Sequence, residues 1–67
     1  MLILSVYFRC PPDQVDVLRP HMRTVIKASR AEPGCLVYTL AEDLAEPGLI
    51  RAFEIYADDA ALKAHGD

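Results

Sequence analysis

The chain has 67 residues, of which 52% are hydrophobic and 25% are charged, a composition typical of one packed domain rather than of a disordered segment. Its net charge of −3 and its seven scattered Lys and Arg residues supply no basic field for phosphates, which argues against nucleic acid as a partner. The longest nearly apolar run, Met1 to Phe8, is too short for a membrane helix of roughly 20 residues and lacks a basic leader, so we expect a cytoplasmic protein with no membrane partner.

The first half of the chain predicts a strand followed by a helix. Leu2 to Phe8 is rich in β-branched and aromatic residues and ends at the breaker Cys10-Pro11-Pro12, which favours a strand buried on both faces. Asp13 is the expected helix cap, with Asp16 three residues later in a box-like position. An amphipathic helix is then predicted by the spacings of three and four between Val15, Leu18, Met22, Val25 and Ser29, and Ile26 widens the apolar stripe.

Pro20 interrupts this helix and leaves two possibilities. A proline inside a helix removes one backbone hydrogen bond and clashes one turn back, which predicts a kink near Asp16. Alternatively the helix begins at Pro20, where proline is well tolerated as a first residue. The stripe through Val15 and Leu18 favours the kink.

The second half predicts a hairpin and a second helix. Glu32-Pro33-Gly34 ends the first helix, because proline disfavours a helical residue before it and glycine supplies a left-handed turn. Strands are predicted over Cys35 to Glu42 and Leu49 to Tyr56, joined by the polar turn 43–48. Asp58 or Asp59 then caps a helix that runs through His65 and has fewer than three turns, so we expect a single domain over residues 1–67 that is incomplete at its C-terminal end.

Three segments resemble the antibiotic biosynthesis monooxygenase family in order and spacing. They are Ser29-Arg30-Ala31-Glu32-Pro33-Gly34-Cys35-Leu36-Val37-Tyr38, Phe53-Glu54-Ile55-Tyr56 and Ala61-Leu62-Lys63-Ala64-His65. The resemblance implies an α+β fold, a ferredoxin-like βαββαβ unit that pairs with a second copy of itself to form a dimeric α/β barrel. The final strand of this unit is not in the sequence. The family's usual tryptophan in the second segment is Tyr56 in this chain.

The residue pattern also predicts a homodimer through the sheet face. The last predicted strand is apolar on both faces, with Leu49, Phe53 and Ile55 on one and Ile50, Ala52 and Tyr56 on the other. Helices can cover only one face of a single sheet, and a chain near 60 residues buries only about 60% of its unfolded surface. We therefore expect a second copy to cover the other face.

Glu54 and His65 are the candidate catalytic residues. Glu54 lies between Phe53 and Ile55, where an unpaired carboxylate is costly, so it needs a partner. His65 follows Leu62 by three residues, on the inward face of an amphipathic helix, and histidine suits a substrate-deprotonating base. Each residue also has a structural interpretation, Glu54 as a hydrogen-bonded carboxylate and His65 as a satisfied core histidine. His21 is expected on the surface.

Tyr38, Tyr56 and Ala52 are the residues expected to line a substrate pocket. Tyrosine is mainly a large core residue with one polar handle, so packing is the alternative for both tyrosines. If the hairpin register places Tyr38 opposite Glu54, these two form a polar set with His65. The other register leaves Glu54 facing Val37 without a donor.

No motif for a cofactor or a metal is present in the sequence. There is no Gly-rich phosphate loop, nucleophile elbow or metal-ligand spacing, and Cys10 and Cys35 are expected to be free thiols that the topology keeps apart. The sequence and the resemblance together predict a cofactor-independent monooxygenase acting on a small aromatic substrate, a quinol or polycyclic phenol. The alternatives are a non-catalytic dimeric domain, stress-related or binding a small aromatic molecule, and a haem-degrading enzyme.

Overall fold

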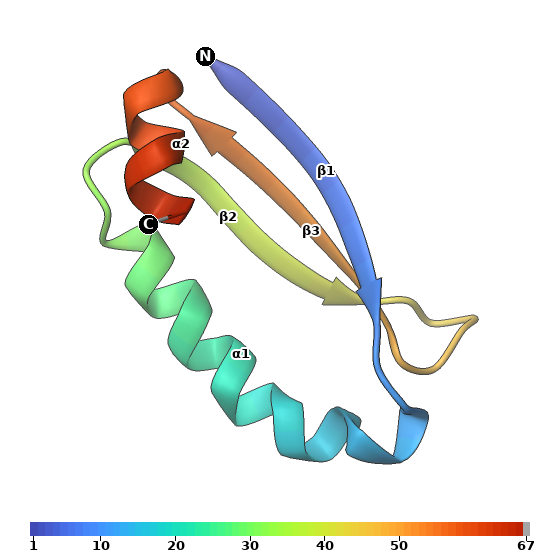
Figure 1. Ribbon diagram of the computed structural model, residues 1–67. Helices are drawn as coiled ribbons and strands as arrows, with labels where there is room; N and C mark the ends of the chain where they lie inside the picture. The colour runs from blue at the N-terminus through green and yellow to red at the C-terminus, as the bar shows by residue number, and fades with distance from the viewer. Residues whose placement is uncertain (67) are drawn as a thin grey trace.

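Three strands form one antiparallel sheet, and both helices lie on the same face of it (Figure 1). The computed structural model describes residues 1–66. Its elements in chain order are β1 (Leu2–Arg9), the 3-10 turn η1 (Pro12–Gln14), α1 (Val15–Arg30), β2 (Cys35–Glu42), β3 (Leu49–Tyr56) and α2 (Asp59–Gly66). The predicted α+β class and the βαββα order are confirmed. Neither of the two helices is long and apolar enough to cross a lipid bilayer.

The register of the hairpin brings the candidate residues onto one face of the sheet. β3 lies between β1 and β2 and pairs antiparallel with both, so β1 and β2 run parallel to each other. Tyr38 lies opposite Glu54, which is the register that supplies a polar neighbour, and Val37 lies opposite Ile55 instead. Because directly paired residues point to the same face, Tyr38 and Glu54 share the side that carries the helices.

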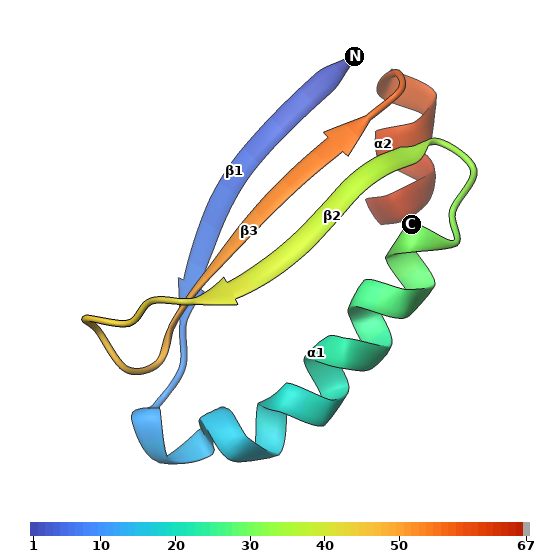
Figure 2. The ribbon, with the colours of Figure 1, turned by 180° about the vertical axis from the view of Figure 1, so that it is seen from behind.

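The two faces of the sheet differ sharply in burial. On β3 every second residue from Ile50 to Tyr56 is buried under the helices, including Ala52 and Glu54. The opposite face is uncovered, as the view from behind shows (Figure 2). There Ile3, Tyr7 and Phe53 are 60%, 59% and 44% exposed. The alternation of period two therefore separates a packed face from an open apolar face.

The start of α1 differs from two expectations, a cap at Asp13 and a first helical residue at Pro20. Asp13 lies inside η1 and makes no capping bond, and the residue before α1 is Gln14, whose N–H bonds the Pro11 carbonyl oxygen at 2.9 Å. The Pro11-Pro12 pair favours a 3-10 turn here, because both residues lack an N–H and have a fixed φ. Pro20 lies inside the helix, so a helix that begins at Pro20 is wrong. Figure 1 shows α1 changing direction over its first turns.

Arginines on α1 hold the helix against β2. The Arg19 guanidinium donates to both carboxylate oxygens of Glu42, with Nε–Oε2 at 2.7 Å and Nη2–Oε1 at 2.9 Å, and it also donates to Asp16. Arg30 Nε donates to the Tyr38 backbone oxygen at 2.9 Å. The two contacts fix the helix along the length of β2, because the bidentate pair is directional as well as favourable.

Gly48 closes the β2–β3 loop against the end of β1. The Asp43 carboxylate accepts hydrogen bonds from the backbone N–H groups of Ala45 and Glu46, and these bonds hold its pKa below the ordinary value. Gly48 has φ of +88°, and its carbonyl accepts a bond from Cys10 N–H at 2.9 Å. A Cβ at this position would lie 2.3 Å from the Cys10 carbonyl oxygen. Both the backbone conformation and the close approach therefore require glycine.

The cysteines are free, as predicted. Cys10 follows the end of β1 and Cys35 begins β2, and neither forms a disulfide. Because β1 and β2 run parallel with β3 between them, these two residues lie near opposite ends of the sheet.

Replacing Gly48 with alanine is expected to destabilise the fold. The left-handed backbone alone costs an L-residue about 1–2 kcal/mol, and the clash with the Cys10 carbonyl oxygen adds to it. Each kcal/mol corresponds to about 4–8 °C in melting temperature for a domain of this size. Gly66→Ala is the matched control, since a Cβ there meets no atom within 4 Å. Equal melting temperatures for the two variants would contradict this role of Gly48.

Candidate active site

The first turn of α2 is seated on the turn that follows α1. Asp58 Oδ1 accepts the Ala61 N–H at 2.8 Å, so Asp58 rather than Asp59 caps the helix. The Ala57 N–H donates to the Gly34 carbonyl oxygen at 2.9 Å. A Cβ on Gly34 would lie 2.1 Å from the Ala61 Cβ. Gly34 was expected to supply a left-handed turn, but the one glycine with positive φ in residues 1–66 is Gly48, so Gly34 serves by leaving room for α2.

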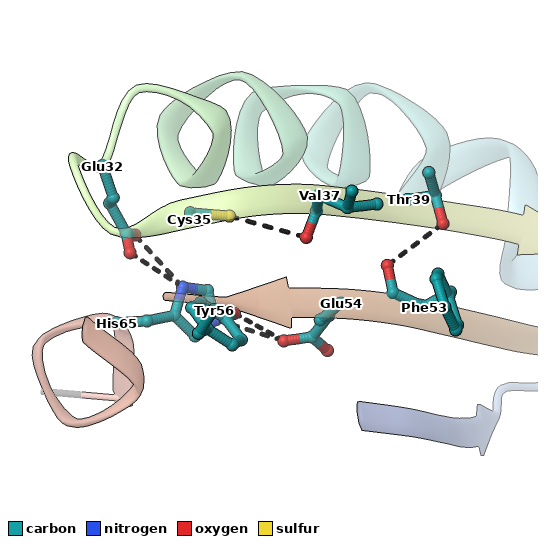
Figure 3. A network of polar contacts seen from close by, with 8 residues as sticks. All are labelled: Glu32, Cys35, Val37, Thr39, Phe53, Glu54, Tyr56 and His65. Atoms are coloured by element: carbon teal, nitrogen blue, oxygen red, sulfur yellow. Dashed lines mark hydrogen bonds and ion pairs between the residues drawn. The ribbon is translucent and has the colours of Figure 1, made fainter. Parts of the chain in front are cut away.

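Helix α2 places His65 above the turn that contains Gly34. It follows Ala61 by four residues and therefore shares the helix face that meets Gly34. His65 Nδ1 lies 3.1 Å from both carboxylate oxygens of Glu32, as Figure 3 shows. The side chain is 21% exposed. The Nδ1 side of the imidazole is thus held by the carboxylate of Glu32, which lies in the turn after α1.

Glu54 presents a buried carboxylate to the other side of the imidazole. It is 7% exposed, and the Tyr56 hydroxyl donates to its Oε1 at 2.6 Å. His65 Nε2 lies 3.9 Å from the same oxygen (Figure 3). Glu54 and Tyr56 meet because residues two apart on a strand point to the same face. The structure therefore brings together the predicted pair Glu54 and His65, with Tyr56 as the donor to the carboxylate.

Two tyrosine rings enclose the imidazole. The ring centroids of Tyr38 and Tyr56 lie 5.4 and 5.2 Å from that of His65, with interplanar angles of 47° and 44°. Both tyrosines are buried, and Tyr56 is among the largest fully buried side chains. His65 consequently has carboxylates near its two nitrogens and aromatic rings at its sides, in a partly buried setting that strengthens electrostatic interactions.

The tyrosines act as neutral phenols. Burial raises the pKa of Tyr56 strongly, and its hydrogen bond to Glu54 and the charge of that carboxylate raise the pKa further. Burial and the Glu54 charge likewise raise the pKa of Tyr38, although a hydrogen bond with Ser29 opposes the shift. Tyr56 is therefore a hydrogen-bond donor to Glu54 near neutral pH rather than a phenolate base.

Cys35 stands beside the cluster as a protonated thiol. Its Sγ donates to the Val37 carbonyl oxygen at 3.6 Å. Burial raises its pKa, and the nearby charges of Glu32 and Glu54 raise it further. Since the thiolate is the reactive form of cysteine, this environment argues against nucleophilic chemistry at Cys35.

A separate cavity lies further along the helix face of the sheet. It has a volume of about 180 Å³ and lies between α1 and the strands, lined by Arg19, Met22, Arg23, Ile26, Leu40, Ala41, Glu42 and Ile50. Ala52 lies between this cavity and Glu54 on β3, opposite Leu40. Of the residues expected to line a pocket, Tyr38 and Tyr56 thus flank His65, whereas Ala52 adjoins the floor of the cavity.

Two features of the cluster were not predicted from the sequence. Glu32 is part of a predicted helix stop and of a segment that resembles the family, but nothing local indicates its contact with His65. The donor role of Tyr56 toward Glu54 follows from their spacing of two on one strand, a signal that the sequence does contain. Within residues 1–66, no group of three or more His, Cys, Asp and Glu side chains is arranged to hold a metal ion.

Known proteins are similar to this chain in sequence and fold. A protein from Synechocystis sp., sll1783, is 31% identical over 64 residues, which cover 96% of this chain and 44% of that protein. The Bacillus subtilis protein named "Putative monooxygenase YcnE" is 28% identical over the whole chain and 70% of its own length. The crystal structure of an antibiotic biosynthesis monooxygenase superposes with a TM-score of 0.92 at 34% identity, covering 97% of this chain and 68% of that one.

These relatives extend beyond the region that they share with this chain, which spans less than half of the Synechocystis protein. The sequence model of the antibiotic biosynthesis monooxygenase family matches residues 1–67. The matched region includes the turn, strand and helix that carry Glu32, Glu54, Tyr56 and His65. The chain belongs to the antibiotic biosynthesis monooxygenase family.

Proposed function

We propose that this protein is a cofactor-independent monooxygenase that acts on a small quinol or polycyclic phenol, with His65 as the base. The observation that supports this best is the imidazole held between two carboxylates, with Nδ1 on Glu32 and Nε2 facing Glu54. Family membership and the resemblance to a monooxygenase of solved structure support the same class of reaction.

The chemistry requires a base more than it requires a cofactor. An electron-rich dihydroxyarene becomes a far better electron donor when its hydroxyl group loses a proton, and the arenolate can then pass electrons to O₂. Overall, a hydroquinone and O₂ give a hydroxyquinone and water: one oxygen atom enters the ring, the other leaves as water, and the substrate supplies all four electrons. The protein must therefore accept a proton, exclude water and stabilise developing charge.

The residues of the cluster divide these tasks. His65 takes the proton from the substrate hydroxyl at Nε2. The imidazolium that results is stabilised by Glu54, whose Oε1 is 3.9 Å from that nitrogen and is held in place by the Tyr56 hydroxyl. Tyr38 and Tyr56 pack against the imidazole and hold it in place.

A homodimer through the open sheet face completes the proposed assembly. That face exposes Ile3, Tyr7 and Phe53, which lie on adjacent strands. Apolar side chains that lie together on a sheet face gain about 25 cal/mol for each Å² that is removed from water. A second copy of the same face would cover them on both protomers at once.

A second function is favoured by the position of the cavity. The space between α1 and the strands is lined by apolar residues such as Leu40 and Ile50 together with the charged Arg19, Arg23 and Glu42, and it contains none of the Glu32, Glu54 and His65 cluster. A protein that sequesters a small aromatic molecule there without converting it would use this cavity and leave His65 with a structural role.

Loss of the base should abolish turnover while the fold remains. His65→Ala and Glu54→Gln are each expected to lower oxygen uptake about 10²–10⁴-fold, the range that general-base catalysis contributes, when the full-length protein is assayed with a panel of quinols. The double variant should lose little beyond either single variant, because the groups act as a unit.

Controls separate a catalytic from a structural role. His21→Ala and Glu46→Gln remove the same functional groups from exposed positions and should leave oxygen uptake unchanged. If His65→Ala instead lowers the melting temperature and spares oxygen uptake, the base assignment is wrong. Ligand binding without oxygen uptake by the unaltered protein would favour sequestration.

The oligomeric state provides a test of the proposed dimer. Light scattering is expected to give the mass of a dimer at micromolar concentration, and Phe53→Glu should shift it toward a monomer because it places a charge in the apolar face. Leu44→Glu is the matched control, since Leu44 is fully exposed in the β2–β3 loop. A stable folded monomer of the unaltered protein would refute the dimer.

A further inference from the structure

We propose that Glu32 is a positioning residue that fixes the tautomer of His65, so that Nδ1 carries the proton and Nε2 is free to accept one from the substrate. The inference rests on the proposed base role of His65. It adds that Glu32 determines which of the two ring nitrogens acts as the base. A neutral imidazole carries one N–H and one lone pair, so whichever neighbour holds the N–H decides which nitrogen can act.

Two carboxylates compete for the single proton of the ring. Glu32 lies 3.1 Å from Nδ1 through both of its oxygens, within hydrogen-bond distance. Glu54 Oε1 lies 3.9 Å from Nε2, beyond that distance, and already accepts the hydroxyl hydrogen of Tyr56. The shorter contact favours the proton on Nδ1, because a carboxylate can only accept and the hydrogen-bond energy falls steeply with distance.

The backbone keeps the Glu32 carboxylate in place. The Glu32 N–H donates to the Ser29 carbonyl oxygen at 3.1 Å, and the Glu32 carbonyl accepts the Cys35 N–H at 3.1 Å. Hydrogen bonds therefore fix the main chain on both sides of the residue. Because Gly34 in the same turn seats Ala61 of α2, the carboxylate and the imidazole are positioned by one local contact.

The proton step follows from this arrangement. The O–H bond of the substrate breaks, its proton goes to Nε2, and the electron pair stays on the substrate oxygen. The hydrogen on Nδ1 stays covalently attached to that nitrogen and hydrogen-bonded to Glu32, so no proton passes to the Glu32 carboxylate. The imidazolium then has a carboxylate at each N–H, and Glu32 stabilises the charged form as well as the reactive tautomer.

The tautomer can be read directly by long-range ¹H–¹⁵N NMR correlation of the His65 ring in the full-length protein. We expect the Nδ1–H form in the unaltered protein at a pH at which the ring is neutral. Glu32→Gln keeps the shape of the side chain but offers an amide N–H to Nδ1, so the population should shift toward the Nε2–H form. Oxygen uptake should fall at least about 10-fold, within the roughly 10⁴-fold that a wrong tautomer costs a Ser-His-Asp triad.

The chain offers a matched control in a second Ala-Glu-Pro-Gly tetrapeptide. Glu46 occupies the same place in residues 45–48 and pairs with Arg9 on the surface, so Glu46→Gln should change neither the tautomer nor oxygen uptake. An Nε2–H tautomer in the unaltered protein would overturn the inference, whether or not any variant folds. So would a Glu32→Gln variant with an unchanged tautomer. Absence of oxygen uptake by the unaltered protein would contradict only the proposed function, because the tautomer is measured without substrate.

Discussion

The close approach of α2 to the turn after α1 is the contact on which the site depends. Gly34 and Ala61 leave no room for a further side chain between them, and the Ala57 N–H bonds the Gly34 carbonyl oxygen. Asp58 caps the helix at this point and sets where it begins. His65 is then one turn further along the same helix face, so a contact between backbones determines where the imidazole lies.

The buried carboxylate of Glu54 needs partners, because burial of an unpaired charge is costly. Taking an ionised carboxylate out of water costs several kcal/mol even after relaxation, whereas one hydrogen bond to a charged group contributes about 1.5–3 kcal/mol. The Tyr56 hydroxyl therefore offsets only part of the cost. His65 Nε2, 3.9 Å from the same carboxylate oxygen, is a second polar neighbour of this group.

The sequence predicted the sheet better than it predicted the helix ends and the site. The strands β2 and β3 have the predicted bounds, because β-branched and aromatic residues mark the strands and Gly48 and Asp43 mark the loop. The pairing of Tyr38 with Glu54 is the register that a buried carboxylate's need for a polar neighbour favoured, although the hydroxyl that donates to Glu54 is that of Tyr56. The prediction that Asp13 caps the helix was wrong because the two prolines favour a 3-10 turn, and Asp13 lies inside that turn.

Glu32 shows why part of the site could not be predicted. Its partner His65 lies 33 residues later, and their contact requires the hairpin to form and α2 to return over the turn. Local pattern reports a helix stop at Glu32-Pro33-Gly34 and nothing more. A left-handed backbone was expected at the glycine of this stop, but its observed role is steric and depends on Ala61, which is also distant in the sequence.

The central claim, that the Gly34–Ala61 contact positions His65, is tested most directly by nuclear Overhauser contacts between the His65 and Tyr56 rings, whose centroids are 5.2 Å apart. The contacts should be present in the unaltered protein, absent in Gly34→Ala, and at least partly restored in Gly34→Ala/Ala61→Gly, which removes the opposing Cβ. Retention of the same ring contacts in Gly34→Ala would contradict the account.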